Sequence, residues 1–189
     1  MAPGRIRDGV GLTNALAAGA PAAPAGDADG PLVGPLRVGG VDFREVADDD
    51  VEQVVALWDA CGLVRPWNDA LRDVADARSN PTSTVLVAHG GGAEDADPGS
   101  AVGPGAVVAT VLAGFDGHRG WIYYLAVTPA LQGTGLGRDA VVAAEAWLAT
   151  QGVRKVRLMV RSTNTQVLGF YERLGYTDAE CTVLGRDLP

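Results

Sequence analysis

Apolar and polar residues follow regular spacings along the chain from about residue 41 onward. Alternating or continuous apolar stretches predict strands at 41–46, 84–88, 106–115, 121–127 and 154–160. Apolar residues spaced three and four apart predict helices that begin near 51, 69, 135 and 164 and end near 62, 78, 150 and 174. Further strands are expected within 176–188. The predicted order of elements is β α α β β β α β α β β.

The ends of the last predicted helix carry their own signals. Thr163 and Gln166 suit a capping box at its start, and Gly175 suits the residue that follows its end.

Two segments have a different composition from the rest. More than half of residues 1–38 are Ala, Gly or Pro, and none is aromatic, so we expect a disordered tail there. The weakly apolar stretch after Arg5 and Arg7 is a poor secretory signal, because Gly and Asn interrupt it. Residues 39–189 form the predicted domain, with a flexible Gly-rich insertion at 90–105.

Composition narrows the function classes. The formal net charge of −8 belongs to residues 39–189, which disfavours nucleic acid and membrane surfaces as partners. No apolar stretch is long enough to span a membrane. The cysteines, Cys61 and Cys181, fit a reducing cytoplasm. The histidines, His89 and His118, stand in no metal-ligand spacing, so no metal site is expected.

A glycine-rich turn links the strand 121–127 to the helix that begins near 135. It reads Gln132-Gly133-Thr134-Gly135-Leu136-Gly137. The backbone N–H groups at the start of a helix lack intrahelical partners and suit a diphosphate. A Walker loop is excluded because Arg138-Asp139 follows the glycines, where that loop needs Lys and Ser or Thr. The loose dinucleotide pattern is also matched, but the next strand ends in Arg161 without the expected carboxylate.

Two motifs in the same order resemble those of the GCN5-related N-acetyltransferases. The first is Gln132-x-x-Gly135-x-Gly137. The second runs from Asn164 through Phe170-Tyr171-Glu172-Arg173 to Gly175-Tyr176. Segments 65–69 and 116–120 resemble one little-characterised bacterial branch of that family. The resemblance implies an α+β fold with a mostly antiparallel sheet, a splayed parallel strand pair and about four flanking helices.

The resemblance also implies an acetyl-coenzyme A site. The diphosphate would bind at Gln132, Gly133, Thr134, Gly135, Leu136, Gly137 and Arg138. The pantetheine arm would pair with the backbone of Leu125, Ala126 and Val127 and bond to Asn164, and Tyr171 would protonate the departing thiolate. Two plainer alternatives stay open, in which Tyr171 is a core aromatic and Asn164 only begins a helix.

The general base departs from the family pattern, because Met159 stands where one branch carries a Glu. Either another group takes the proton, or water relays it, or the amine arrives neutral. His118 and Asp116 are the candidates to serve the amine, since imidazole titrates near neutral pH. Their segment, 116–120, also has the composition of a tight turn, so a purely structural role stays open. The other residues expected on the acceptor side are Arg65, Trp67, Asn68, Asp69, Arg119 and Tyr124.

The predicted function is an acetyl-CoA-dependent N-acetyltransferase that moves the acetyl group directly to an amine of a small molecule or peptide. Two alternatives stay open: an acetyltransferase of ribosomal-protein N-termini, and an acyl-CoA-binding module without catalysis. The acceptor cannot be named from the sequence, and a homodimer stays open.

Overall fold

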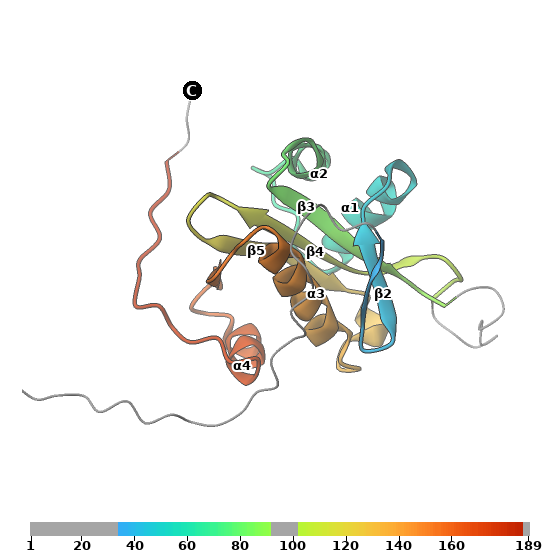
Figure 1. Ribbon diagram of the computed structural model, residues 1–189. Coiled ribbons are helices and arrows are strands. Elements are labelled where there is room, and N and C mark those ends of the chain that lie inside the picture. Colours follow the sequence, from blue (N-terminus) through green and yellow to red (C-terminus); the bar gives the residue numbers. More distant parts are fainter. Residues whose placement is uncertain (1–33, 92–101, 187–189) are drawn as a thin grey trace, which may run out of the picture.

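A computed structural model describes residues 34–91 and 102–186 and shows one six-stranded sheet in the order β1-β2-β3-β4-β5-β6 (Figure 1). The strands are β1 Leu36–Val38, β2 Val41–Glu45, β3 Ser83–His89, β4 Val107–Phe115, β5 Gly120–Val127 and β6 Val156–Leu158. The helices are α1 Val51–Ala60, α2 Ala70–Ser79, α3 Leu136–Thr150 and α4 Thr165–Arg173, with 3₁₀ turns at Asp48–Asp50 and Pro129–Leu131. Neighbouring strands are antiparallel except for β5 and β6, which are parallel. The predicted sheet and its four helices are therefore confirmed.

Helices cover both faces of the sheet (Figure 1). On one face, α1 and α2 pack through buried side chains such as Val54, Trp58 and Val74. On the other face, α3 packs through Ala140, Trp147 and their neighbours, and α4 adds the half-buried Phe170 beside it. The continuous apolar stretch in β3 and β4 follows from this arrangement, because strands covered on both faces need no polar side.

A β-bulge interrupts the pairing of β4 with β5. Thr110 pairs with Ala126 and Leu112 pairs with Tyr123, so two residues of β5 lie opposite Val111 alone. Tyr124 lies in this bulge with a φ of +49°, which is unusual for a bulky residue. Tyr124 consequently packs on the face covered by α1 and α2, whereas the next residue of β5 packs toward α3.

The first strand, β1, lies within the segment that the sequence predicted to be a disordered tail. Leu36 pairs with Phe43 and Val38 with Val41, and the turn between the two strands is Gly39-Gly40. Both glycines have positive φ, which this two-residue hairpin requires. The predicted boundary between tail and domain at residue 38 was therefore wrong, because β1 already belongs to the sheet. Residues 1–33 of the predicted tail, and residues 92–101 of the predicted insertion, lie outside the described residues.

The strands expected after residue 176 were also wrong: the described chain to Arg186 contains none beyond α4, and this segment runs away from the sheet (Figure 1). Local geometry explains part of this. The Asp178 carboxylate accepts a hydrogen bond from the Glu180 N–H at 2.7 Å, and Glu180 has a φ of +53°, so the backbone turns instead of extending.

Candidate functional site

The sheet opens between β5 and β6. Their parallel pairing begins at Gly120 and Val156 and ends at Ile122 and Leu158. Beyond that point, one edge of β5 has no neighbouring strand in the described structure, and the chain after Leu158 leads to α4. Unpaired backbone groups at a sheet edge can bind an extended ligand as an added strand. The backbone of Leu125–Val127, predicted to bind pantetheine, lies on this open edge.

The glycine loop and the start of α3 lie at the end of the same strand. Gly135 is the N-cap of α3 with a φ of +102°, and Gly133 has a φ of +83°. A Cβ atom at either glycine would project into open space, which leaves room for a ligand in front of the helix. The Gln132 side chain donates to the Val127 carbonyl oxygen at 3.1 Å and ties the loop to β5.

The first turn of α3 presents amides of Leu136, Gly137 and Arg138, which have no acceptor within the helix. Thr134 donates to the Leu131 carbonyl oxygen at 2.8 Å, and the Arg138 guanidinium pairs with Asp139. These contacts fix the loop while leaving the amides available. The residues therefore fit a diphosphate, as the sequence predicted.

The α4 helix supplies Tyr171 and Asn164. The structure places Asn164 at the N-cap of α4, where its side-chain oxygen accepts from the Val167 N–H at 3.3 Å, so the predicted capping box at Thr163 was wrong. The N–H groups of Gly175 and Tyr176 bond back to Glu172 and Tyr171, which confirms Gly175 as the residue after the helix.

Tyr171 is 8% exposed and lines a cavity of about 1100 Å³ together with Leu158, Met159 and Arg119. None of the hydrogen bonds among the described residues involves the Tyr171 hydroxyl, and its ring meets Phe170 edge-on. Burial raises the pKa of Tyr171 to about 12, so the phenol keeps its proton at neutral pH. The hydroxyl is consequently a proton donor without an internal acceptor.

Tyr124 lies at the edge of the gap on the α1 and α2 side. Its hydroxyl donates to Asp73 Oδ2 at 2.5 Å and accepts from Asn68 Nδ2 at 3.1 Å. Its ring stacks on Trp58, with the ring centroids 4.0 Å apart. Tyr124 and Asn68, both expected on the acceptor side, are therefore brought together.

The sequence did not single out Asp73. A signal was present, however, because Asp73 falls between Ala70, Val74 and Ala77 on the buried stripe of α2. A charged residue on the sheet-facing side of a helix needs a partner. Tyr124, 51 residues further along the chain, supplies it.

Other predicted acceptor-side residues have local structural contacts. The Arg65 guanidinium donates to the carbonyl oxygens of Gly62 and Val64, which closes the loop after α1. Asp69 caps α2 by accepting from the Arg72 N–H at 3.1 Å. Trp67 is 73% exposed, so it does not pack in the core.

The turn between β4 and β5 holds the two candidates for the base. The Asp116 carboxylate accepts from the backbone N–H groups of His118 and Arg119 and from Trp121 Nε1, all within 2.8 Å. These hydrogen bonds lower the pKa of Asp116 to about 2, which makes it a poor proton acceptor near neutral pH. His118 is exposed, and its Nδ1 lies 3.2 Å from the Arg119 guanidinium. Asp116 is therefore better explained as a turn residue.

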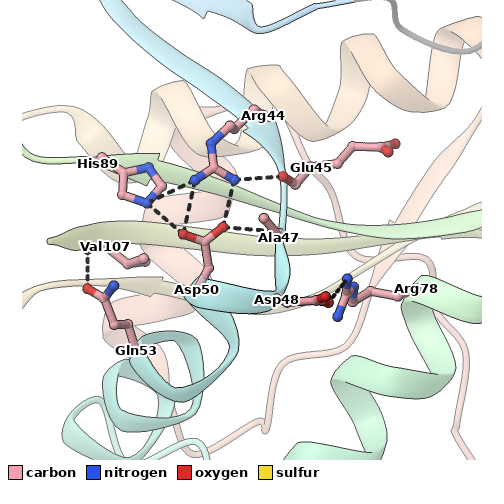
Figure 2. Close-up of polar contacts among 9 residues, drawn as sticks. All are labelled: Arg44, Glu45, Ala47, Asp48, Asp50, Gln53, Arg78, His89 and Val107. Carbon is pink, nitrogen blue, oxygen red and sulfur yellow. Dashed lines mark hydrogen bonds and ion pairs between the residues drawn. The ribbon is translucent and has the colours of Figure 1, made fainter. Parts of the chain in front are cut away.

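A second charged cluster joins β2, β3 and the turn before α1 (Figure 2). Asp50 is 3% exposed, and its two oxygens accept from Arg44 at 2.6 and 3.0 Å, from the Ala47 N–H at 2.8 Å and from His89 Nε2 at 2.8 Å. Since the carboxylate can only accept, His89 Nε2 carries the proton. Arg44, the Ala47 amide and His89 lower the pKa of Asp50 to about 2 against the opposing effect of burial.

Comparison with known proteins agrees with this geometry. Residues 51–176 match the Acetyltransferase (GNAT) family. The protein named Acetyltransferase ECA0875 of Pectobacterium atrosepticum is 36% identical over 148 residues, which cover 78% of this chain and 96% of the relative. The chain therefore belongs to the GNAT acetyltransferase family, and its predicted class, an acyltransferase enzyme, is confirmed.

Solved structures share the fold. The aminoglycoside acetyltransferase AAC(6')-Iy, in complex with the bisubstrate analog CoA-S-monomethyl-acetylneamine, matches with a TM-score of 0.62 and 15% identity over 79% of this chain and 99% of its own. A predicted acetyltransferase from Clostridium acetobutylicum, solved with acetyl-CoA, matches with a TM-score of 0.58 and 15% identity over 77% of this chain and 96% of its own. CoA and acetyl-CoA are thus ligands of proteins with this fold. Within the described residues, no helix is long and apolar enough to cross a membrane.

Proposed function

We propose that this protein is an N-acetyltransferase that uses acetyl-CoA as co-substrate and transfers the acetyl group directly to an amine. The observation that carries the proposal is the continuity of the open edge of β5 with the glycine loop. A diphosphate at the amides of Leu136–Arg138 would direct an extended arm along Leu125–Val127 toward Tyr124.

When bound, acetyl-CoA supplies the activated acetyl group. The chain contributes amides that hold the diphosphate and an open strand edge that orients the arm. Tyr171, protonated and buried beside the gap, is suited to give a proton to the departing sulfur. The reaction needs no covalent enzyme intermediate.

We infer that the acceptor is a primary amine of a small molecule or peptide. The acceptor side of the proposed site is the α1 and α2 face, where Asn68, Asp73 and Tyr124 form a polar cluster beside the exposed Trp67. AAC(6')-Iy, whose solved complex holds an acetylneamine analog, is a precedent for a small polyamine on this fold. The free thiols of Cys61 and Cys181 support a reducing, cytoplasmic location.

Two measurements on the full chain test the proposal. Acetyl-CoA at 100 times its Kd should stabilise the fold by about 2.7 kcal/mol in a thermal melt. CoA release should then be followed with a panel of polyamines, aminoglycosides and N-terminal peptides. Release with at least one amine supports the enzyme. A melting shift without release from any acceptor indicates an acyl-CoA-binding module, and no shift with millimolar acetyl-CoA contradicts the cofactor site.

A further inference from the structure

The amine that attacks a thioester must lose a proton, and the open part of the sheet lacks a carboxylate at the position where one branch of the family has Glu. Met159 is half exposed there and offers only a thioether. Asp116 has its oxygens occupied by three donors. His118 is exposed in the turn before β5, at the opposite end of that strand from Leu125–Val127. We therefore look for the proton acceptor among the groups of β5, α1 and α2 beside the gap.

The backbone of Leu125–Val127 is the segment predicted to bind pantetheine. Tyr124 is the polar side chain of β5 nearest to this segment, since Leu125 follows it directly. Its hydroxyl donates to Asp73 at 2.5 Å and accepts from Asn68 at 3.1 Å. A phenol that donates one hydrogen bond and accepts one still has a lone pair for a second donor. The short O–H to carboxylate contact is of the charge-assisted kind, and it aligns the hydroxyl proton with the Asp73 oxygen.

Several contacts hold Tyr124 in place. The ring stacks on Trp58, whose Nε1 donates to Thr110 Oγ1 at 2.9 Å, and Thr110 Oγ1 in turn donates to the Tyr124 carbonyl oxygen at 3.2 Å. The φ of +49° lies in the left-handed region that a bulky residue rarely adopts, so the backbone at Tyr124 is strained. A strained residue fixed by a buried network is typical of a functional position.

We propose that Tyr124 accepts the proton of the attacking amine and passes its own hydroxyl proton to Asp73, so that the site takes primary amines that arrive as ammonium ions. This inference rests on the proposed acetyl transfer. One N–H bond of the ammonium breaks as the Tyr124 oxygen gains a proton and the Asp73 carboxylate receives the former hydroxyl proton. The neutral nitrogen then bonds to the acetyl carbon and gives up its second proton to water, the C–S bond breaks, and the sulfur takes a proton from Tyr171. Asp73 releases its proton to water, and Tyr171 regains one from water.

The surroundings agree with this role. Burial, and then the hydrogen bond to Asp73, raise the pKa of Tyr124, so the hydroxyl holds the proton that the relay needs at neutral pH. Asn68 donates to the hydroxyl and positions it. The other titratable or charged groups on α1 and α2 and at their ends are Glu52, Asp59, Cys61, Asp69, Arg72, Asp76 and Arg78.

The test uses two small amines that differ in charge. At pH 7, methylamine is a cation that needs a base, whereas hydroxylamine is already neutral. Release of CoA from acetyl-CoA is measured with each, after subtraction of the uncatalysed rate, for Tyr124→Phe and Asp73→Asn. The matched controls are Tyr123→Phe, whose ring stacks on Trp121 in the same strand, and Asp76→Asn, which pairs with Arg72 on the same helix. Acetyl-CoA melting shifts verify that each variant folds and binds the co-substrate.

Both relay variants should lower kcat/KM for methylamine on the order of 10²-fold, and change it for hydroxylamine by less than roughly threefold. The controls should match the wild type with both amines. An equal loss with both amines, or wild-type rates with methylamine, overturns the relay while leaving the transferase intact. If the wild type binds acetyl-CoA but transfers neither to these two amines nor to any amine of the panel above, the proposed enzyme fails, and the relay fails with it.

Discussion

Two polar clusters on this molecule differ in whether the protein satisfies all of their hydrogen-bonding groups. The Asp50 cluster joins β2, β3 and the turn before α1, and four donors use both of its carboxylate oxygens (Figure 2). The Tyr124 cluster stands where the sheet opens, and its carboxylate has one side-chain donor within the described structure. The first cluster is satisfied within the protein, whereas the second keeps carboxylate capacity that is open to solvent or to a ligand.

The difference separates a structural role from a chemical one. A buried charge that is fully paired holds segments together, and removal of one partner leaves the rest uncompensated. A polar cluster with remaining capacity, placed beside unpaired strand backbone and a helix N-terminus, can bind and act on a ligand. Four variants and one exchange experiment test this distinction.

The largest expected effect is at the start of α3. Gly135→Val should abolish the melting shift caused by acetyl-CoA, because its side chain would fill the open space before the helix amides. The control is Gly152→Val after the same helix, where φ is +75° and a Cβ also meets open space. Both variants carry a conformational cost of roughly 1–2 kcal/mol, but only Gly135→Val should lose the shift. Retention of the shift in Gly135→Val contradicts the diphosphate site.

The next effect concerns stability. Asp50→Ala should destabilise the fold by roughly 3 kcal/mol, because Arg44 and His89 lose their common partner. The control Asp42→Ala removes a surface pair with Arg37 and should cost less than about 1 kcal/mol. Urea unfolding measures both. Similar losses for the two variants would show that the Asp50 cluster is no more than a surface pair.

The pH dependence of stability follows from the same group. The folded-state pKa of Asp50 is about 2, below its ordinary value of 3.8. Its stabilising contribution is therefore present above about pH 4 and is lost as the pH falls from 4 toward 2. Asp50→Ala should flatten the unfolding free energy across that interval.

Tyr171→Phe should lower kcat on the order of 10²-fold with little change in acetyl-CoA affinity, the range for loss of a positioned acid. Tyr176→Phe is the comparison, because its hydroxyl already donates to Glu145 at 2.6 Å. That variant should mainly lose stability, by about 1 kcal/mol. Unchanged turnover in Tyr171→Phe would indicate that Tyr171 is a core aromatic and not the catalytic acid.

The smallest expected effect is at the N-terminal strand. Deletion of residues 1–38 should lower Tm by roughly 5 °C relative to deletion of residues 1–33, because Leu36 and Val38 pack against the core. Equal Tm values would show that β1 contributes nothing and that the predicted boundary at residue 38 is sufficient.

Part of the fold and of the candidate site could be predicted from the sequence alone. The cofactor side was predictable because strand 121–127, the glycines and the helix that begins near 135 are adjacent in the chain. The bulge at Tyr124 was not, because strand alternation carries no signal for one extra residue and φ depends on the partner strand. Asp73 reaches Tyr124 only through packing of α2 on the sheet.

The errors at the chain ends have a similar origin. Leu36–Val38 is too short for periodicity to register, and only its pairing with β2 makes it a strand. Residues 176–188 carry apolar side chains typical of strands, but Val183 is 66% exposed and Leu184 is 89% exposed in the described structure. Strand formation depends on an available partner edge, and sequence spacing contains no such information.

Amide hydrogen exchange with and without acetyl-CoA tests the difference between the two regions most directly. Acetyl-CoA should slow exchange at the amides of Leu125–Val127 and Leu136–Arg138, and leave residues 44–50 and 85–89 unchanged, because only the first set has backbone groups for a ligand. Exchange that is unchanged at Leu125–Val127 with acetyl-CoA bound, or slowed equally in both regions, would contradict an acetyl-transfer site in the open part of the sheet.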